Sequence, residues 1–360
     1  MYLNKKQIQI ETDKCLGCKN PQCELKCPLH LSAKYFIQLY KEQKYEELVS
    51  YLYMSNPFAE ICGFVCPNKF CMMNCIRKNI DNSINIKGLQ SSLSHLYKHL
   101  LCVPINHTNR KIAIIGGGVA GLTASWYLSL QGYKIDVFEK ENKLGGELNL
   151  IPSYRLPKNV LDNELQLFLN NPNINVFYNM EVKNYESLLN EYEYVIVAVG
   201  KQFYNNLNID NEEYMIEYDE FLSNMKDYDN IAIIGGGNVA VDCAVSSKTD
   251  TNNVTMFVRR NFYDMKIDEE HLQKLFSKKI NIVNNFTPTN VYKDSKLHLE
   301  GKLFNQSYIG FNNFDVIVKA IGSQQIINKI SNKRIIYIPV STTVVETIAQ
   351  TKDVLNNIDF

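Results

Sequence analysis

The placement of cysteine constrains this chain more than any other feature of its sequence. Nine of its ten cysteines, all but Cys243, lie within the first 102 of 360 residues. Eight of these nine form two crowded runs, CLGCKNPQCELKCP at 15–28 and CGFVCPNKFCMMNC at 62–75. The N-terminal stretch lacks the apolar core of a signal peptide, so we expect a cytoplasmic location, where reducing conditions disfavour disulfides. Bound metal is therefore the main use expected for these thiols.

The spacing within the two runs favours iron–sulfur clusters over zinc. Each run has four cysteines separated by short gaps: Cys15-x2-Cys18-x4-Cys23-x3-Cys27 and Cys62-x3-Cys66-x4-Cys71-x3-Cys75. Structural zinc usually takes two separated C-x2-C pairs, whereas crowded runs that end in Cys-Pro suit cubane clusters. We therefore expect [4Fe–4S] clusters here, with zinc as the alternative.

A repeated glycine motif predicts two dinucleotide-binding folds. The segment IAIIGGG occurs at 112–118 and again, letter for letter, at 231–237. An apolar run, closely spaced glycines and a helical pattern predict a strand, a tight turn and a helix whose first N–H groups bind a pyrophosphate. In the first copy we expect cofactor binding by Gly116, Gly118, Ala120, Gly121 and Glu139. The acidic residue in this set follows the second strand, where it can accept hydrogen bonds from ribose hydroxyls.

The second copy differs where the ribose of the nucleotide is expected. Its cofactor-binding loop is predicted to contain Gly235, Gly237, Asn238, Val239 and Ala240. The strand that follows ends in Arg259 and Arg260 instead of an acid, and paired arginines suit a 2′-phosphate. The sequence thus predicts NADPH over NADH, with Lys266 as a third cation. Solvated surface charges are the alternative for all three side chains.

Two dinucleotide folds beside iron–sulfur clusters imply a flavin. A nicotinamide releases two electrons together as a hydride, whereas a cluster accepts one electron, and an isoalloxazine ring connects the two. We therefore predict FAD at the first fold and NADPH at the second. Hydride transfer to a flavin depends on positioning more than on a protein acid or base, so we assign no catalytic side chain.

Composition argues against two other classes of function. Lysine plus arginine and aspartate plus glutamate each number 38, so no net field favours nucleic acid or an anionic membrane. The sequence holds no run of about 18 apolar residues that could cross a bilayer. A chain of this length exceeds one simple core and predicts two or three domains.

Taken together, the motifs resemble the NADPH-oxidising portion shared by dihydropyrimidine dehydrogenase and the small subunit of glutamate synthase. Further landmarks are LGGELNLIPSYRLP at 144–157, VIVAVG at 195–200 and VIVKAIG at 316–322. The resemblance covers nearly the whole chain. It implies an α/β fold class, with a helical domain for two [4Fe–4S] clusters followed by two Rossmann-like domains, the NADPH domain being inserted in the FAD domain. It also adds Gly145, Gly146, Arg155, Gly200 and Gly322 to the cofactor-binding residues.

The resemblance implies four segments. They are 1–107 for the helical iron–sulfur domain, 108–203 for the first part of the FAD domain, 204–322 for the NADPH domain and 323–360 for a shortened return to the FAD domain.

The segment INIKGLQ at 84–90 resembles the dihydropyrimidine dehydrogenase branch more than the glutamate synthase branch. In the matching family motif the glutamine is itself an iron ligand. The resemblance assigns Cys15, Cys18, Cys23 and Cys75 to one cluster, and Cys27, Cys66, Cys71 and Gln90 to the other. The last cysteine of each run then serves the cluster of the other run. A polar glutamine at a helix start is the alternative for Gln90, and Cys62 is left spare.

The family implies an electron-input subunit, an NAD(P)H-dependent FAD and iron–sulfur oxidoreductase that passes electrons to a separate partner. That partner is an FMN-containing barrel that reduces uracil or thymine, or, in the other branch, the large subunit of glutamate synthase. The C-terminal segment departs from the family pattern, and this departure leaves a second hypothesis about function open. Residues 334–360 keep a strand and a helix beginning near Thr342 or Thr343 but lack the Gly-Asp of relatives. An iron–sulfur electron-transfer or scaffold protein without NADPH turnover is therefore the alternative.

Overall fold

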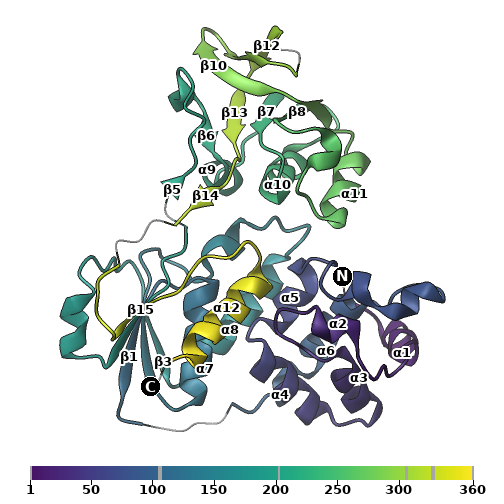
Figure 1. Cartoon of the computed structure of the whole chain (residues 1–360), viewed down its shortest axis with the longest axis vertical. Helices are drawn as coiled ribbons and strands as arrows, with labels where there is room; N and C mark the ends of the chain where they lie inside the picture. The colour runs from purple at the N-terminus through teal and green to yellow at the C-terminus, as the bar shows by residue number, and fades with distance from the viewer. Residues whose placement is uncertain (1, 104–107, 202, 305–306, 326–328, 359–360) are drawn as a thin grey trace. The chain divides into compact units, whose positions relative to one another are not determined.

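The computed structural model describes residues 2–103, 108–201, 203–304, 307–325 and 329–358. The chain divides into two compact units, one formed by Met1–Gly200 with Ile327–Phe360 and the other by Lys201–Ile326. Each unit is described by itself (Figure 1). None of the helices in the described ranges combines the length and the apolar character needed to cross a membrane.

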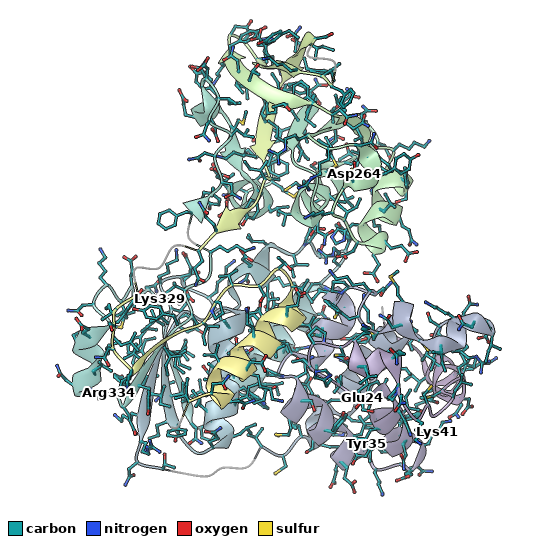
Figure 2. All side chains as sticks on the ribbon, viewed as in Figure 1. Glu24, Tyr35, Lys41, Asp264, Lys329 and Arg334 are labelled. Atoms are coloured by element: carbon teal, nitrogen blue, oxygen red, sulfur yellow. The ribbon has the colours of Figure 1, made fainter. Side chains whose placement is uncertain are left out.

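Short helices form the N-terminal part of the first unit. Three of them begin at a side chain that accepts a backbone N–H: Asn4, Ser32 and Asn85. Glu24 and Tyr35, labelled in Figure 2, lie on the second and third helices. The elements are α1 (Lys5–Asp13), α2 (Gln22–Leu25), α3 (Ala33–Lys41), α4 (Tyr45–Ser55), α5 (Ala59–Val65), η1 (Met72–Asn74), η2 (Ile76–Asn79), α6 (Ile86–Tyr97) and η3 (Lys98–Leu100).

The rest of the first unit is a parallel five-stranded sheet in the order β15-β4-β1-β2-β3. Its three central strands, β4, β1 and β2, have apolar, buried interiors, as expected for a parallel sheet covered by helices. Figure 1 shows α12 in yellow beside α7. The elements are β1 (Lys111–Ile115), α7 (Val119–Leu130), β2 (Lys134–Phe138), η4 (Gly146–Leu150), α8 (Lys158–Leu169), β3 (Ile174–Phe177), η5 (Glu186–Asn190), β4 (Tyr194–Val197), β15 (Ile335–Tyr337) and α12 (Val344–Asn356).

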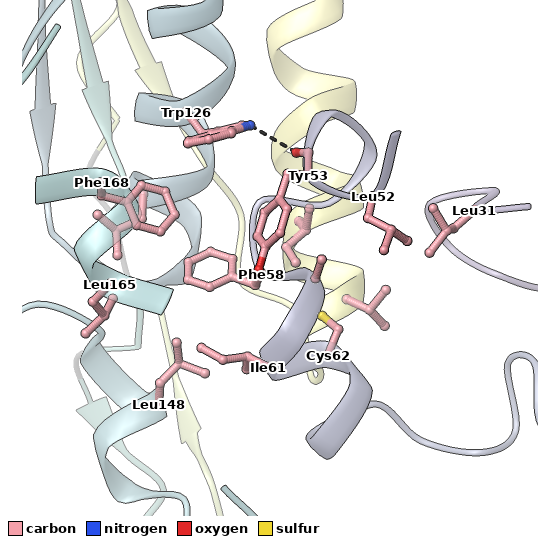
Figure 3. Packing of buried hydrophobic residues seen from close by; sticks show 14 of the residues in the cluster. Leu31, Leu52, Tyr53, Phe58, Ile61, Cys62, Trp126, Leu148, Leu165 and Phe168 are labelled. Carbon is pink, nitrogen blue, oxygen red and sulfur yellow. Dashed lines mark hydrogen bonds between the residues drawn. The ribbon is translucent and has the colours of Figure 1, made fainter. Parts of the chain in front are cut away.

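One apolar core joins the N-terminal helices to this sheet domain (Figure 3). The indole N–H of Trp126 on α7 donates to the carbonyl of Tyr53 on α4 at 3.1 Å. The rings of Phe58 and Phe168 lie 5.2 Å apart across the same boundary. Burial of large aromatic side chains is the main stabilising term in such a core, so the helices and the sheet form a single packed body.

The second unit holds another parallel sheet in the order β6-β13-β7-β8-β9, a three-stranded antiparallel sheet β10-β11-β12 and the short pair β14-β5. Phe257 on β8 packs against Phe286 and Phe314, which connects the two larger sheets. The elements are β5 (Phe203–Tyr204), η6 (Glu212–Tyr214), β6 (Ile216–Glu217), α9 (Tyr218–Ser223), β7 (Asn230–Ile234), α10 (Asn238–Ser247), β8 (Asn253–Val258), η7 (Phe262–Asp264), α11 (Glu269–Ser277), β9 (Asn281–Asn284), β10 (Thr287–Lys293), β11 (Leu297–Lys302), β12 (Tyr308–Phe314), β13 (Val316–Lys319) and β14 (Ser323–Gln324).

Candidate iron–sulfur and dinucleotide sites

The two cysteine runs line two neighbouring cavities among the N-terminal helices. The thiol-bearing residues of the first cavity are Cys15, Cys18, Cys23 and Cys75. Between the first two of these the chain turns at Gly17, whose φ of +61° lies in the left-handed region that favours glycine. The fourth comes from the distant second run, so this cavity combines the two runs.

The second cavity is lined by Cys27, Cys62, Cys66, Cys71 and Gln90, and Cys23 lines both cavities. Gln90 lies on α6 and is 8% exposed. Its amide nitrogen donates to the carbonyl of Ala59 at 2.7 Å. This hydrogen bond orients the amide group of Gln90 through its nitrogen. The amide oxygen is an acceptor and is therefore the atom suited to bind a metal.

Burial raises the pKa of five of the thiols that line these cavities, those of Cys23, Cys27, Cys62, Cys66 and Cys71. For Cys23 it raises the pKa to about 11, with further increases from the nearby charges of Cys75, Cys15 and Cys18. Burial raises the pKa of Cys71 to about 12, and the charge of Cys27 adds to the effect. A bound metal would overcome this cost, because a coordinating thiol is deprotonated outright.

The cavities fit the clusters implied by the sequence. Within the described ranges, groups of three or more His, Cys, Asp or Glu side chains that could hold one metal ion are not found. A cubane cluster does not gather its ligands around one ion, because each of its four iron atoms takes its own protein ligand. Each cavity presents the four side chains assigned to one cluster, and the second is lined in addition by Cys62 and by Cys23, which the assignment gives to the first.

The first glycine loop lies between β1 and α7, with the predicted acid against it. Glu139 directly follows β2 and its carboxylate accepts from the backbone N–H of Gly117 at 2.6 Å. Gly121 lies in the first turn of α7, where an added Cβ would come 1.8 Å from the carbonyl oxygen of Gly116. Any larger residue would therefore separate the helix from the loop, which is the close approach that dinucleotide folds require.

The LGGE segment also lies against this loop. Gly145 donates its backbone N–H to the carbonyl of Gly117 at 2.8 Å. A Cβ added at Gly146 would lie 3.1 Å from the Cα of Gly118, so the two loops approach closely. The other residues expected at this site are Ala120 in the first turn of α7, Arg155 in the turn before α8 and Gly200 shortly after β4.

The second glycine loop lies between β7 and α10. Arg259 and Arg260 directly follow β8, the strand beside β7, and both are exposed. The backbone of Lys266 pairs with that of Gly237, which brings this segment to the loop. The structure thus places Lys266 beside the loop and the arginine pair at the end of the neighbouring strand, which is where a ribose phosphate is expected.

The other residues predicted at the second site differ in how exposed they are and in whether their side chains already bond to protein groups. Asn238 donates to the carboxylate of Asp268 at 2.6 Å and accepts its backbone N–H at 3.0 Å, so the protein uses this side chain. Val239 is 40% exposed and Ala240 is fully buried. Gly235 has a φ of +150° at the loop, and Gly322 follows β13.

Sequence reasoning missed a buried ion network in the first unit. The ammonium of Lys98 lies 2.5 Å from Glu60 of α5 and 2.9 Å from Glu164 of α8. The backbone N–H of Glu60 also donates to Glu164 at 3.1 Å, and burial raises the pKa of the latter to about 7. One signal was present: Glu164 occupies the stripe of α8 that Val160 and Phe168 bury.

A helical domain with two cysteine-lined cavities, joined to two glycine-loop nucleotide folds, defines an iron–sulfur oxidoreductase that uses dinucleotides. Residues 1–99 match the family described as dihydropyrimidine dehydrogenase domain II with a 4Fe-4S cluster. Residues 110–341 match the pyridine nucleotide-disulphide oxidoreductases. The chain belongs to the pyridine nucleotide-disulphide oxidoreductase family, and it is an NAD(P)H-dependent electron-transfer oxidoreductase. This membership favours the enzyme over the scaffold hypothesis.

Three curated relatives illustrate the similarity. The NAD-dependent dihydropyrimidine dehydrogenase subunit PreT of Salmonella typhimurium is 30% identical, over 78% of this chain and 72% of the relative. The NADPH-Fe(3+) oxidoreductase subunit beta of Geobacter sulfurreducens is 27% identical over 78% of this chain, which spans only 44% of that relative. The glutamate synthase (NADPH) small chain of Escherichia coli is 27% identical over 72% of this chain and 61% of the relative.

Solved structures support the fold of the nucleotide domains. Thioredoxin reductase from Lactococcus lactis superposes with a TM-score of 0.54 at 19% identity, covering 69% of this chain and 98% of that protein. At this identity the similarity concerns the fold alone.

Proposed function

We propose that this chain is an electron-input subunit that oxidises NADPH at FAD and delivers electrons through two [4Fe–4S] clusters to a partner that reduces uracil or thymine. The observation that carries the proposal is the lining of the two cavities by the two ligand sets that the family motif implies. The nearest support for the substrate class is the name of the Salmonella typhimurium relative.

The proposed binding residues act in three groups. FAD, held by the loop around Gly116 and by Glu139, would supply the conversion of a hydride into single electrons. The loop around Gly237 and the arginine pair after β8 bind and orient NADPH. The cysteines and Gln90 hold the clusters.

The second cavity is the nearer of the two to the nucleotide fold. Its lining includes Val345 in the first turn of α12, whereas the first cavity is lined only by residues between 15 and 86. Since α12 packs against α7, which begins at the glycine loop, we propose that electrons pass from the nucleotide fold to the second cavity and then to the first.

Anaerobic stopped-flow absorbance tests the proposal. The iron-reconstituted full chain is mixed with NADPH, and bleaching of a flavin band near roughly 450 nm followed by cluster reduction is expected. Uracil reduction should then require an added FMN-barrel subunit. If the chain instead supports glutamate formation with a glutamate synthase large subunit, the alternative suggested by the Escherichia coli relative is correct.

We expect the double variant Arg259→Glu and Arg260→Ser to lower the preference for NADPH over NADH at least tenfold. Each charge-assisted hydrogen bond to the 2′-phosphate contributes about 1.5–3 kcal/mol, and 1.4 kcal/mol corresponds to a factor of ten. Steady-state kcat/KM for both coenzymes measures the ratio. Lys226→Glu, which alters an exposed lysine of the same unit, is the control. An unchanged ratio in the double variant would show that the arginines are only solvated surface charges.

We expect Gln90→Ala to lower the iron content and to change the EPR spectrum of the reduced clusters, because it removes one proposed ligand. Gln90→Cys keeps four ligands but replaces a neutral oxygen with an anionic thiolate, so the midpoint potential of that cluster should fall. Gln22→Ala is the matched control, since Gln22 is an exposed glutamine at the first cavity. If Gln90→Ala behaves like Gln22→Ala, Gln90 is not a ligand.

A further inference from the structure

Exposed apolar side chains lie on the segments that line the first cavity. Leu16 and Ile76 line the cavity and are 45% and 44% exposed. Leu25 on α2 and Met73 on η1 are 54% and 50% exposed, and these two elements contact each other. Single exposed apolar residues are ordinary, but four on the two short segments that line one cavity are the kind of grouping that marks an interface. We call Leu16, Leu25, Met73 and Ile76 the apolar face.

Positive charge is concentrated around the apolar face. Residues 14–34 and 69–81 contain seven lysines and arginines but only two acidic residues, in a chain that is balanced overall. One of those acids, Glu24, which Figure 2 labels, is half-buried. Lys34 lines the first cavity, and the ammonium of Lys78 donates to the carbonyl of Met73 at 2.5 Å. The exposed lysines of the two segments are Lys19, Lys26, Lys34, Lys69 and Lys78.

We propose that the apolar face and its lysines form the docking site for an acidic one-electron carrier protein. An apolar centre excludes water where two redox centres must approach, and a basic rim attracts and orients an acidic partner. The face also includes two lining residues of the first cavity, whose described lining comes from residues between 15 and 86, and this cavity is the last in the proposed series.

This proposal rests on the proposed function, whose clusters deliver the electrons, and adds a transient carrier as a second acceptor beside the FMN-barrel subunit. The overall reaction balances as NADPH plus two oxidised carriers giving NADP+, one proton and two reduced carriers. Because each carrier accepts one electron, docking must occur twice per NADPH, so the complex has to form and dissociate readily. A rim of exposed charges suits such a transient complex, since charge steering raises the association rate more than the affinity.

Binding measured by isothermal titration calorimetry tests the proposal. The full, iron-reconstituted chain is titrated with an oxidised acidic [2Fe–2S] ferredoxin at low and high salt. We expect binding that weakens with salt, and a Kd raised at least tenfold by the triple variant Lys19→Glu, Lys26→Glu and Lys78→Glu. The control reverses three exposed lysines elsewhere, Lys158→Glu, Lys183→Glu and Lys226→Glu, and should change the Kd by less than about twofold. If the two triple variants raise the Kd for ferredoxin equally, the effect comes from net charge and not from the lysines of this surface, and the proposal is wrong.

A second variant tests the apolar part. Leu25→Ser with Met73→Ser should weaken ferredoxin binding at every salt concentration, with iron content unchanged as evidence of folding. Absence of ferredoxin binding to the unaltered chain, or tighter binding of the basic carrier cytochrome c, would overturn the docking site. The titration needs no NADPH, so failure of NADPH oxidation with ferredoxin still bound would count against the proposed function alone. Cluster reduction by NADPH without ferredoxin binding would count against the docking site alone.

Discussion

Lys98→Met is expected to lower the free energy of unfolding by about 3–5 kcal/mol, because it leaves buried carboxylates without their cation. Its ammonium lies between Glu60 and Glu164, whose side chains are at most 1% exposed. Methionine keeps much of the volume of the lysine stem, so the predicted loss comes from charge more than from packing. The network holds α5 of the cluster-binding helices against α8 of the nucleotide fold, so the variant should loosen that contact first.

The size of this effect should depend on pH. Burial raises the pKa of Glu164 from its usual 4.5 to about 7, and the charge of Lys98 opposes a further rise. The folded protein therefore binds this proton more tightly than the unfolded chain does, so the contribution of Glu164 to stability falls as pH rises from about 4.5 to about 7. Without Lys98 the pKa rises further, and the fall continues above pH 7. The loss caused by Lys98→Met should thus be larger at pH 8 than at pH 6.

Chemical denaturation followed by circular dichroism at both pH values measures the loss. Lys158→Met is the matched control, because Lys158 faces Asp162 at 3.5 Å on the surface and such pairs contribute about 0–1 kcal/mol. Adding Glu60→Gln and Glu164→Gln to Lys98→Met should recover part of the stability, since the uncompensated charges are then removed. If Lys98→Met costs no more than Lys158→Met, the buried network does not stabilise the protein.

This network also marks what the sequence could not predict. Glu60, Lys98 and Glu164 come from three segments that are far apart in the chain, and their meeting depends on how the helices pack onto the sheet domain. A buried charged residue on an apolar helix stripe indicates that some partner exists, but not which one. The glycine loops were easier to predict from the sequence. The strand, turn and helix of each loop are adjacent in the chain, so the spacing of the glycines alone specifies the strand–turn–helix geometry.

The antiparallel sheet β10-β11-β12 was also not anticipated. Its strands include TPTNVYK and YIGFNNF, in which proline, glycine and asparagine are typical of turns and obscure the strand pattern. What forms the sheet is burial of Val291, Leu299 and Phe314 against the core of the second unit. Tertiary packing therefore outweighs local preference in this segment.

The cysteine runs were predicted in part, less completely than the glycine loops but better than the buried ion network. Their spacing predicts clusters, whereas the exchange of the last cysteine between runs was implied only by the family. The structure places Cys75 with the first run and Cys27 with the second. Spacing alone could not give this arrangement, because it depends on how η1 contacts α2. The ligand assignment itself remains a proposal that substitution can test.

Cys75→Ser is expected to remove the cluster of the first cavity, and Cys27→Ser the cluster of the second. Each variant should lose about half of the bound iron, because serine is a poor replacement for a soft thiolate ligand at iron. The cross assignment makes a sharper prediction than iron content alone. Cys75→Ser should abolish the same EPR signal as Cys15→Ser, although these residues are 60 positions apart, whereas Cys27→Ser should abolish the same signal as Cys66→Ser.

Iron analysis and EPR of the dithionite-reduced variants measure both outcomes. Cys62→Ser is the matched control, since this buried thiol lines the second cavity but has no ligand role in the assignment. It should keep all of the iron and both signals. If Cys75→Ser and Cys71→Ser instead abolish one common signal, each run binds its own cluster and the cross assignment is wrong. Loss of iron in Cys62→Ser would make that thiol a ligand in place of Gln90, with an all-thiolate cluster of more negative charge and lower midpoint potential.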